Sequence, residues 1–191
     1  MHETIPRLEI HEMRADLADY LRPRVKRLGY LGELFKCSAH APDILLQFMH
    51  LTDALKEALP NRLAEAAVLT IAKLMSNDYE RNQHERLCIR LGFERAWVAE
   101  VESLTPEATA LMTPDELTAQ RYIIAAVESR GHACQEEFKA LATRIGPAQS
   151  MAIVMLVGRY ITHALVVNTL ELVAPVPSIF DDGFTVEKHH D

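Results

Sequence analysis

Hydrophobic residues recur at intervals of three and four along most of this chain, and strict alternation of polar and apolar residues is scarce. A period near 3.6 is that of an amphipathic helix, whereas a half-buried strand has a period of two. The chain is therefore predicted to be all-α. The predicted helices cover residues 10–21, 42–59, 61–75, 78–91, 94–103, 114–130, 134–144 and 147–172.

Proline, glycine and capping residues mark where these helices begin and end. Pro23 is predicted to end or bend the first helix, because proline lacks the N–H that a helix interior needs. Thr113, followed three residues later by Glu116, has the pattern of a capping box and predicts a helix start. Gly146 and Pro147 together predict a stop between the last two helices.

The chain is predicted to form a single helical domain. Its 191 residues and 49% hydrophobic content are enough for one sizeable core. We expect a motif core over residues 42–104 and a second helical half over residues 113–172. The tail, residues 173–191, is rich in proline and charge, so it is expected to lie extended over a neighbouring element or to stay loose.

Charge and composition indicate which partners and which cellular location to expect. Acidic residues outnumber basic ones by 27 to 20, and without a basic stripe nucleic-acid binding is not predicted. Three cysteines without a CxxC pair, and a charged N-terminus without a signal core, predict a cytoplasmic protein. The most apolar window, 151–173, is interrupted by Arg159, His163, Asn168 and Glu171, so a buried helix is predicted there rather than a membrane span.

The residues with the strongest chemical pattern lie between Asn61 and Gly92. Glu80 and His84 are four residues apart, so on a helix their side chains share one face. Tyr79 flanks that face. Glu65 starts an apolar helix that could fold back beside His84. A carboxylate, an imidazole and a phenol that meet beside an apolar core would form a site for proton transfer.

Each of these residues also has a structural explanation. Glu65 could be an acid favoured by a helix dipole, and Glu80 with His84 an ordinary exposed pair. Tyr79 could be a core aromatic whose hydroxyl finds a partner. Cys88, one turn after His84, could be a thiolate beside a base or simply a small buried hydrophobe.

Two further polar residues and a metal site are secondary candidates. Arg159 and His163 share a face of the last predicted helix, where burial would require partners. They could pair with glutamates or contact an anionic ligand. Glu65, Glu80 and His84 suit several divalent ions, but no second histidine stands at helical spacing. Neither a metal nor an organic cofactor is predicted.

The segment 61–92 resembles the core of the carboxymuconolactone decarboxylase and alkylhydroperoxidase AhpD-like superfamily. Many members without cysteines carry R..E, an apolar helix, then YEW..H and a later glycine. Residues 156–172 also resemble the last helix of the longer members, so the resemblance covers about two thirds of the chain. The matching positions here are Arg62, Glu65, Tyr79, Glu80, His84 and Gly92.

The resemblance separates two branches of the superfamily. Members of the peroxidase branch carry a glutamate, a CxxC pair and a histidine, and Asn77 and Glu80 stand here where the two cysteines would be. Because neither side chain can attack a peroxide, peroxidase activity of the AhpD type is not predicted, although the resemblance also implies an oxidoreductase, peroxiredoxin-like family. Glu80 and His84 match the Glu-x-x-x-His of the decarboxylase branch. Arg81 replaces the usual tryptophan and would alter the pocket wall.

The resemblance implies an AhpD-like multihelical fold that self-associates, as a dimer to a hexamer. Our first hypothesis is a lyase-like enzyme that performs acid/base chemistry on a small oxygenated acid, lactone or enone. The alternatives are a non-catalytic helical ligand-binding or scaffold protein, and a residual peroxidase that uses Cys88. In the first hypothesis the catalytic residues are His84, Glu80, Glu65 and Tyr79, and the substrate contacts are Asn77, Arg159 and His163.

Overall fold

The computed structural model describes residues 4–181 and 184, and within these residues the chain forms eight helices and no strand. The all-α prediction is confirmed. The helices are α1 (Ala15–Leu28), α2 (Glu33–Ser38), α3 (Pro42–Ala58), α4 (Asn61–Leu74), α5 (Asp78–Arg90), α6 (Arg95–Glu102), α7 (Pro114–Glu128) and α8 (Gln135–Thr169).

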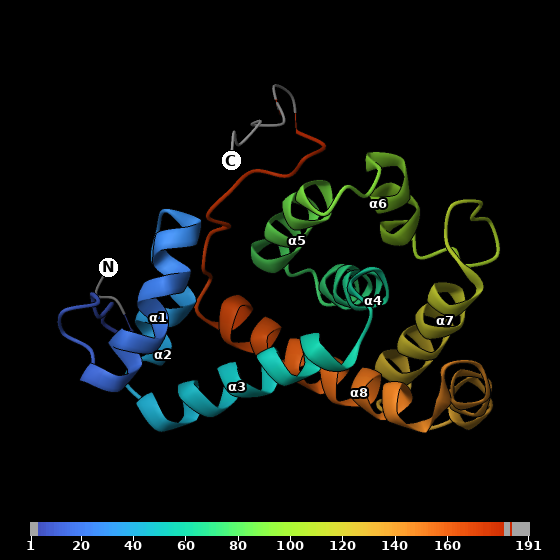
Figure 1. Cartoon of the computed structure of the whole chain (residues 1–191), viewed down its shortest axis with the longest axis horizontal. Helices are drawn as coiled ribbons and strands as arrows, with labels where there is room; N and C mark the ends of the chain where they lie inside the picture. Colours follow the sequence, from blue (N-terminus) through green and yellow to red (C-terminus); the bar gives the residue numbers. More distant parts are fainter. Residues whose placement is uncertain (1–3, 182–183, 185–191) are drawn as a thin grey trace.

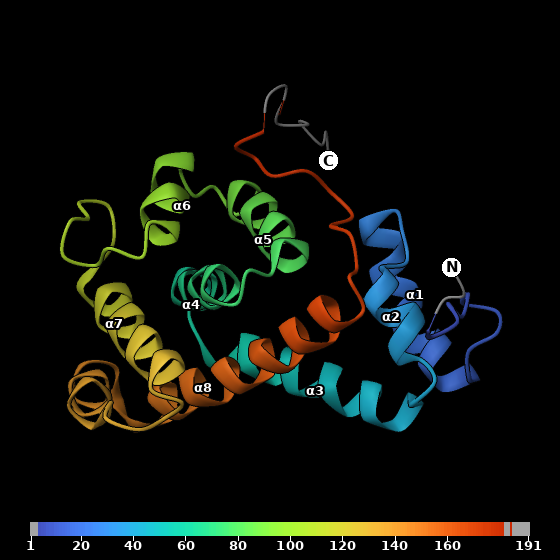
Figure 2. The ribbon, with the colours of Figure 1, turned by 180° about the vertical axis from the view of Figure 1, so that it is seen from behind.

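Helix α4 is the central element of the fold. It contacts α5, α6, α7 and α8, and Figure 1 shows these helices arranged around it. Helix α3 packs against α8, and α1 and α2 lie beside the N-terminal part of α3 (Figure 2). The central position of α4 places its side chains within reach of several neighbours at once.

The composition of α4 explains why it is central. All ten residues from Leu63 to Ala72 are buried, which is typical of a helix in contact with neighbours on every side. Four of these ten residues are alanines, whose small side chains let the surrounding helices approach closely. Glu65 is the charged member of this run, and its side chain therefore needs partners inside the core.

Helix α1 differs from its prediction. It starts at Ala15 rather than near Ile10, and it passes through Pro23 to Leu28. Pro23 and Asp19, whose carbonyl loses its helical partner, are both exposed, so water can hydrogen-bond to that carbonyl. Gly29, with φ of 81°, closes the helix in the left-handed conformation.

Other predicted boundaries agree with the structure. The Thr113 hydroxyl accepts the Glu116 N–H, and the Glu116 carboxylate accepts the Thr113 N–H, so the predicted capping box is confirmed. Gly146 has φ of 80° and ψ of 167°, and it divides α8 into two helical segments, with Pro147 beginning the second. By length and composition α8 could cross a membrane, and 56% of its most apolar window is buried in the protein.

The described part of the tail lies extended across α5 (Figure 1). Asn82 Nδ2 donates to Val176 O at 3.0 Å, and Arg86 Nε donates to Pro177 O at 2.9 Å. The buried Glu85 carboxylate accepts two more hydrogen bonds from residues 178 and 179. These bonds attach the tail beside the residues that form the site described below. The rest of the tail prediction lies outside the described residues.

Candidate active site

The turn between α4 and α5 brings the predicted residues together. Ser76 has φ of 51°, and Asn77 caps α5 with its Oδ1, which accepts the Glu80 N–H at 3.1 Å. This turn folds α5 back along α4. As a result, Glu65 of α4 and His84 of α5 are in contact, as their spacing predicts.

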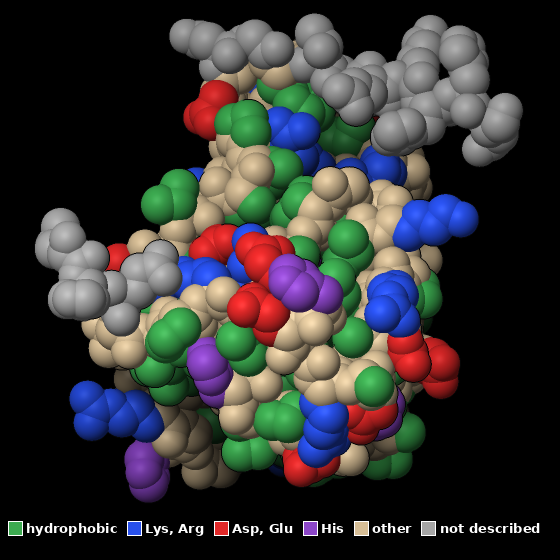
Figure 3. Space-filling model, turned by 90° about the vertical axis from the view of Figure 1, so that its left-hand side faces the viewer, with side chains coloured by type: hydrophobic (Ala, Val, Ile, Leu, Met, Phe, Trp, Pro, Cys, Tyr) green, Lys and Arg blue, Asp and Glu red, His purple; other side chains and the backbone are tan. Residues whose placement is uncertain are grey.

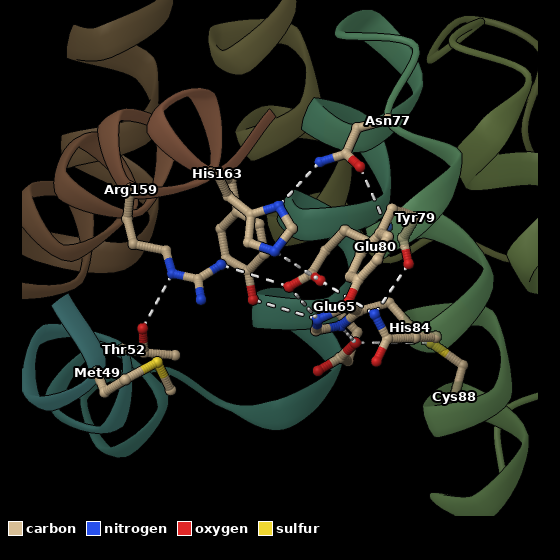
Figure 4. Close-up of polar contacts among 12 residues, drawn as sticks. Met49, Thr52, Glu65, Asn77, Tyr79, Glu80, His84, Cys88, Arg159 and His163 are labelled. Atoms are coloured by element: carbon tan, nitrogen blue, oxygen red, sulfur yellow. Dashed lines mark hydrogen bonds and ion pairs between the residues drawn. The ribbon is translucent and has the colours of Figure 1, made fainter. Parts of the chain in front are cut away.

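The imidazole of His84 lies between two carboxylates and a phenol. Its Nδ1 lies 2.5 Å from Glu65 Oε2, and its Nε2 lies 3.4 Å from Glu80 Oε1. The Tyr160 hydroxyl lies 3.2 Å from the same Nε2. All four residues are buried, and the close-up shows this cluster between α4, α5 and α8 (Figure 4).

The two carboxylates control the protonation of His84. Burial alone would lower the pKa of its imidazole, but the charge and hydrogen bond of Glu65, together with Glu80, outweigh burial and raise the pKa to about 9. Burial alone would raise the pKa of Glu80, but its interactions with His163 and His84 hold that pKa well below its ordinary value. At neutral pH the site therefore contains an imidazolium between carboxylates.

This pKa shift predicts a loss of stability at alkaline pH. An unfolded chain releases the His84 proton near pH 6.5, whereas the folded protein keeps it until about pH 9. The contribution is thus complete below pH 6.5 and disappears as the pH rises to 9. We expect urea denaturation to show a decline on the order of 3 kcal/mol between pH 6.5 and 9.5.

A second group titrates in part of the same range, so the test needs a comparison. Glu102 has its pKa raised to about 8 by burial and by Glu85, and its contribution to stability falls between pH 4.5 and 8. The same Glu102 is present in the His84→Gln variant, so the difference between wild type and variant isolates His84. Parallel pH profiles for the two proteins would contradict the assignment.

Glu80 connects His84 to a second histidine. His163 Nε2 lies 3.1 Å from Glu80 Oε2, and His163 Nδ1 lies 3.1 Å from Asn77 Nδ2 (Figure 4). Because the Asn77 oxygen is occupied by the Glu80 N–H, its amide nitrogen faces His163 and can only donate. In this arrangement Nδ1 of His163 accepts, and Nε2 carries the hydrogen that points at Glu80.

Arg159 completes the surroundings of Glu80. Its Nη1 lies 3.4 Å from Glu80 Oε1, and its Nε donates to Thr52 Oγ1 at 2.9 Å. The guanidinium lies over the rings of Phe48 and Tyr160, at 4.6 and 4.2 Å from their centroids. Of the two explanations left open for Arg159 and His163, the structure shows pairing with a glutamate.

Tyr79 points away from this cluster. Its hydroxyl accepts the Leu34 N–H at 3.3 Å, and its ring packs among residues of α2 and α8. A Cβ at Gly32 would lie 2.8 Å from that hydroxyl, so the turn before α2 approaches it closely. These contacts resemble those of a core aromatic with a satisfied hydroxyl.

Cys88 is fully buried beside Glu65. Its Sγ lies 3.9 Å from Glu65 Oε2, and burial raises the pKa of its thiol. A thiol in these surroundings is largely protonated, which disfavours nucleophilic attack. Among the described residues, no group of three or more His, Cys, Asp or Glu side chains is arranged to hold a metal ion.

A cleft of about 740 Å³ leads to His84. Its inner end is formed by the buried residues Glu80, His84, Arg159 and Tyr160, and α1, α3, α5 and the tail form the remaining walls. Of the predicted substrate contacts, Arg159 lines the cleft, whereas Asn77 and His163 support Glu80 from behind.

Three residues of the site were not predicted from the sequence: Tyr160, Thr52 and the cleft-lining Tyr30. The spacing of Tyr160 could have indicated it, because it lies three residues before His163 on the side of α8 that also carries Arg159. Thr52 and Tyr30 show no local signal, since neither belongs to a charged or repeated pattern.

Comparison with known proteins gives matches in structure alone. No family model matches the sequence, and no curated protein does. The debrominase Bmp8 superposes with a TM-score of 0.79 at 16% identity, covering 92% of this chain and 94% of that one. An uncharacterized peroxidase-related protein with the alkylhydroperoxidase AhpD core, from Ralstonia eutropha JMP134, gives 0.76 at 16% identity and covers 88% and 90%.

A third match shows the same architecture over a shorter length. The protein of unknown function ATU0492 from Agrobacterium tumefaciens gives a TM-score of 0.65 at 14% identity, over 73% of this chain and 96% of that one. At such identities the likeness is one of fold. Together with the eight-helix arrangement and the paired Glu65 and His84, these matches show that the chain has the AhpD-like fold that its sequence predicts.

Proposed function

We propose that this protein is an acid/base enzyme in which protonated His84 delivers a proton to an enolate formed from a small oxygenated acid, lactone or enone. One observation carries the proposal. The His84 imidazole lies at the inner end of a cleft, between two carboxylates that raise its pKa to about 9. A group with this pKa stays protonated at neutral pH and can act as a general acid.

The neighbours of His84 have separate roles in this mechanism. Glu65 accepts the Nδ1 hydrogen, which orients the ring and leaves Nε2 as the donor. Glu80 stabilises the imidazolium. Tyr160 lies beside Nε2 at the inner end of the cleft, where its hydroxyl can hydrogen-bond to a substrate oxygen. Arg159 can bind a carboxylate or enolate oxygen through its remaining nitrogen, Nη2.

For a substrate with a carbonyl group β to its carboxylate, the steps balance without an oxidant or a reductant. The bond between carbon and the carboxylate breaks, CO₂ leaves, and the electron pair remains as an enolate. The Nε2–H bond of His84 then breaks as a C–H bond forms on that carbon. Neutral His84 recovers its proton from solvent.

The structural neighbours support a small organic substrate. One of them is called a debrominase, and a variant of that protein was solved in complex with 2,3,4-tribromopyrrole. Peroxide reduction is less well supported here, because Cys88 is buried and the pKa of its thiol is raised. The proposed chemistry needs no thiol.

The proposal is tested by proton exchange with solvent. The protein is incubated in D₂O with a panel of β-keto acids, small lactones and enones, and carbon-bound deuterium is followed by NMR. We expect deuterium to enter at least one compound faster with the protein than in buffer alone, and the rate that the protein adds should fall as the pH passes about 9. A His84 ring that titrates near 6.5, with no exchange across the panel, would contradict the proposal.

A second candidate function is suggested by the polar groups of the cluster, which already have partners within the protein. His84, Glu80 and Arg159 are already paired with protein groups, an arrangement that would also suit a ligand-binding protein without chemistry. In that case a compound from the panel would bind without exchanging deuterium, and His84→Ala would leave its affinity within about twofold. Exchange that depends on His84 would exclude this alternative.

A further inference from the structure

The outer part of the cleft is strongly basic. The described residues that line the cleft include seven Lys and Arg side chains and one acidic side chain, Glu80. The chain as a whole has a net charge of −7, so this concentration of positive charge runs against the overall composition. On the face viewed in Figure 3, basic and acidic side chains are interspersed, and several basic ones lie toward the top.

Three of the seven cations combine with a tyrosine at the cleft entrance. We call Arg27, Arg86, Arg90 and Tyr30 the mouth of the cleft. Arg27 belongs to the end of α1, and Arg86 and Arg90 to the second half of α5. Burial raises the pKa of Tyr30, and the positive charges of all three arginines oppose that rise, so the three lie close enough to act on one hydroxyl.

Among the described residues, the side chains of Arg27 and Arg90 have no hydrogen-bond or ion-pair partner, and both are exposed. By contrast, two cations deeper in the cleft are paired, Arg24 with Asp53 and Arg159 with Glu80. The mouth therefore keeps its positive charge, whereas the inner end is largely neutralised.

Helix ends explain part of this pattern but not all of it. Arg27 and Arg90 lie in the last turns of α1 and α5, where the helix dipole favours a cation. The two helix ends together contribute about one negative charge. The three positive charges of the arginines exceed that negative charge. The dipole also does not explain why the two helix ends meet at one cleft.

Arg86 is held in place before any ligand binds. Its Nε donates to Pro177 O at 2.9 Å, and its guanidinium lies 4.9 Å from the Phe184 ring centroid. These contacts use one nitrogen and leave the other two for other partners. A side chain that is already ordered loses less conformational entropy when it binds a ligand.

We propose that the mouth of the cleft binds a phosphate group carried by the substrate, with Arg27, Arg86 and Arg90 as donors. Three guanidinium groups match the two negative charges and the several oxygens of a phosphate monoester better than a single carboxylate. The inference rests on the proposed function only because it takes this cleft as the path to His84. The phosphate would hold the substrate while its reacting carbon reaches the inner end.

Calorimetric titration of the full chain at pH 8 and constant ionic strength tests this proposal, with inorganic phosphate and glycerol phosphate as probes. We expect Arg27→Gln and Arg90→Gln each to weaken binding by about 10-fold, the cost of one charged hydrogen bond. Arg144→Gln is the matched control, because Arg144 lies outside the cleft and pairs with Asp115. Its affinity should stay within about twofold of wild type.

Three results would overturn the inference. They are no phosphate binding by the wild type, equal weakening in Arg144→Gln, and malonate binding as tight as that of phosphate. The His84→Ala variant separates this inference from the proposed function, because it should keep phosphate affinity. If the wild-type protein exchanges deuterium but does not bind phosphate, only the phosphate site is rejected. If it binds phosphate but does not exchange deuterium, only the acid/base proposal is rejected.

Discussion

Replacement of His84 by Ala is expected to slow deuterium exchange into the substrate by about 10²- to 10⁴-fold, the usual contribution of a positioned general acid. Tyr160 lies nearest to Nε2, but burial raises the pKa of its hydroxyl, which makes it a weak acid for proton transfer. Exchange is measured by NMR at pH 7, with far-ultraviolet circular dichroism to verify the helical content.

Two variants sharpen this prediction. His84→Gln keeps a side chain able to donate a hydrogen bond to Glu65 but cannot transfer a proton, so it should be as inactive as His84→Ala. His132→Ala is the matched control, because His132 is exposed and lies outside the residues that line the cleft. A rate for His84→Gln within threefold of wild type, on the order of 1 kcal/mol or less, would reject His84 as the acid.

Replacement of Glu80 by Ala is expected to lower the free energy of unfolding by about 3–5 kcal/mol, the loss seen when one partner of a buried ion pair is removed. The carboxylate faces Arg159, His163 and His84, and all three are buried. Without it these polar groups would remain in the core beside a cavity. Urea denaturation at pH 7 measures the effect.

Two further variants distinguish the effect of the Glu80 charge from the effect of its side-chain volume. Glu80→Gln retains the volume and one acceptor oxygen, so it should lose less stability than Glu80→Ala. Glu57→Ala removes an exposed carboxylate from α3 and should change stability by no more than about 0.5 kcal/mol. A Glu80→Ala protein within 1 kcal/mol of wild type would show that the cluster contributes little, on the scale that applies to exposed pairs.

Much of the fold was predictable because its signals are local. The capping box at Thr113, the break at Asn77 and the division of α8 at Gly146 each depend on a few neighbouring residues. Pro23 was misleading because the exposure of α1 at that point, which no local pattern reveals, lets water satisfy the lost hydrogen bond. Self-association and a cytoplasmic location remain predictions.

In the candidate site, too, some contacts could be predicted from the local sequence and others could not. Glu80 and His84 share a helix face, and Glu65 precedes them on the adjacent helix, so their meeting follows from one turn. The contacts of Arg159 and Tyr160 with that pair join residues 79 and 76 positions apart, and they depend on how α8 crosses α5. The convergence of Arg27 with Arg90 likewise depends on where two helices end in space.

By itself, the amino-acid sequence determined the helices, most of their ends and the acid–imidazole pair on α4 and α5, because hydrogen bonds and side-chain spacing within a few turns govern all of these. The tertiary structure alone decided the rest. Tertiary packing placed His84 between two carboxylates that keep it protonated, turned Tyr79 away from it, and placed a basic mouth at the entrance of its cleft. These properties depend on the dielectric environment and on how distant helices cross, and no short stretch of residues determines either of them.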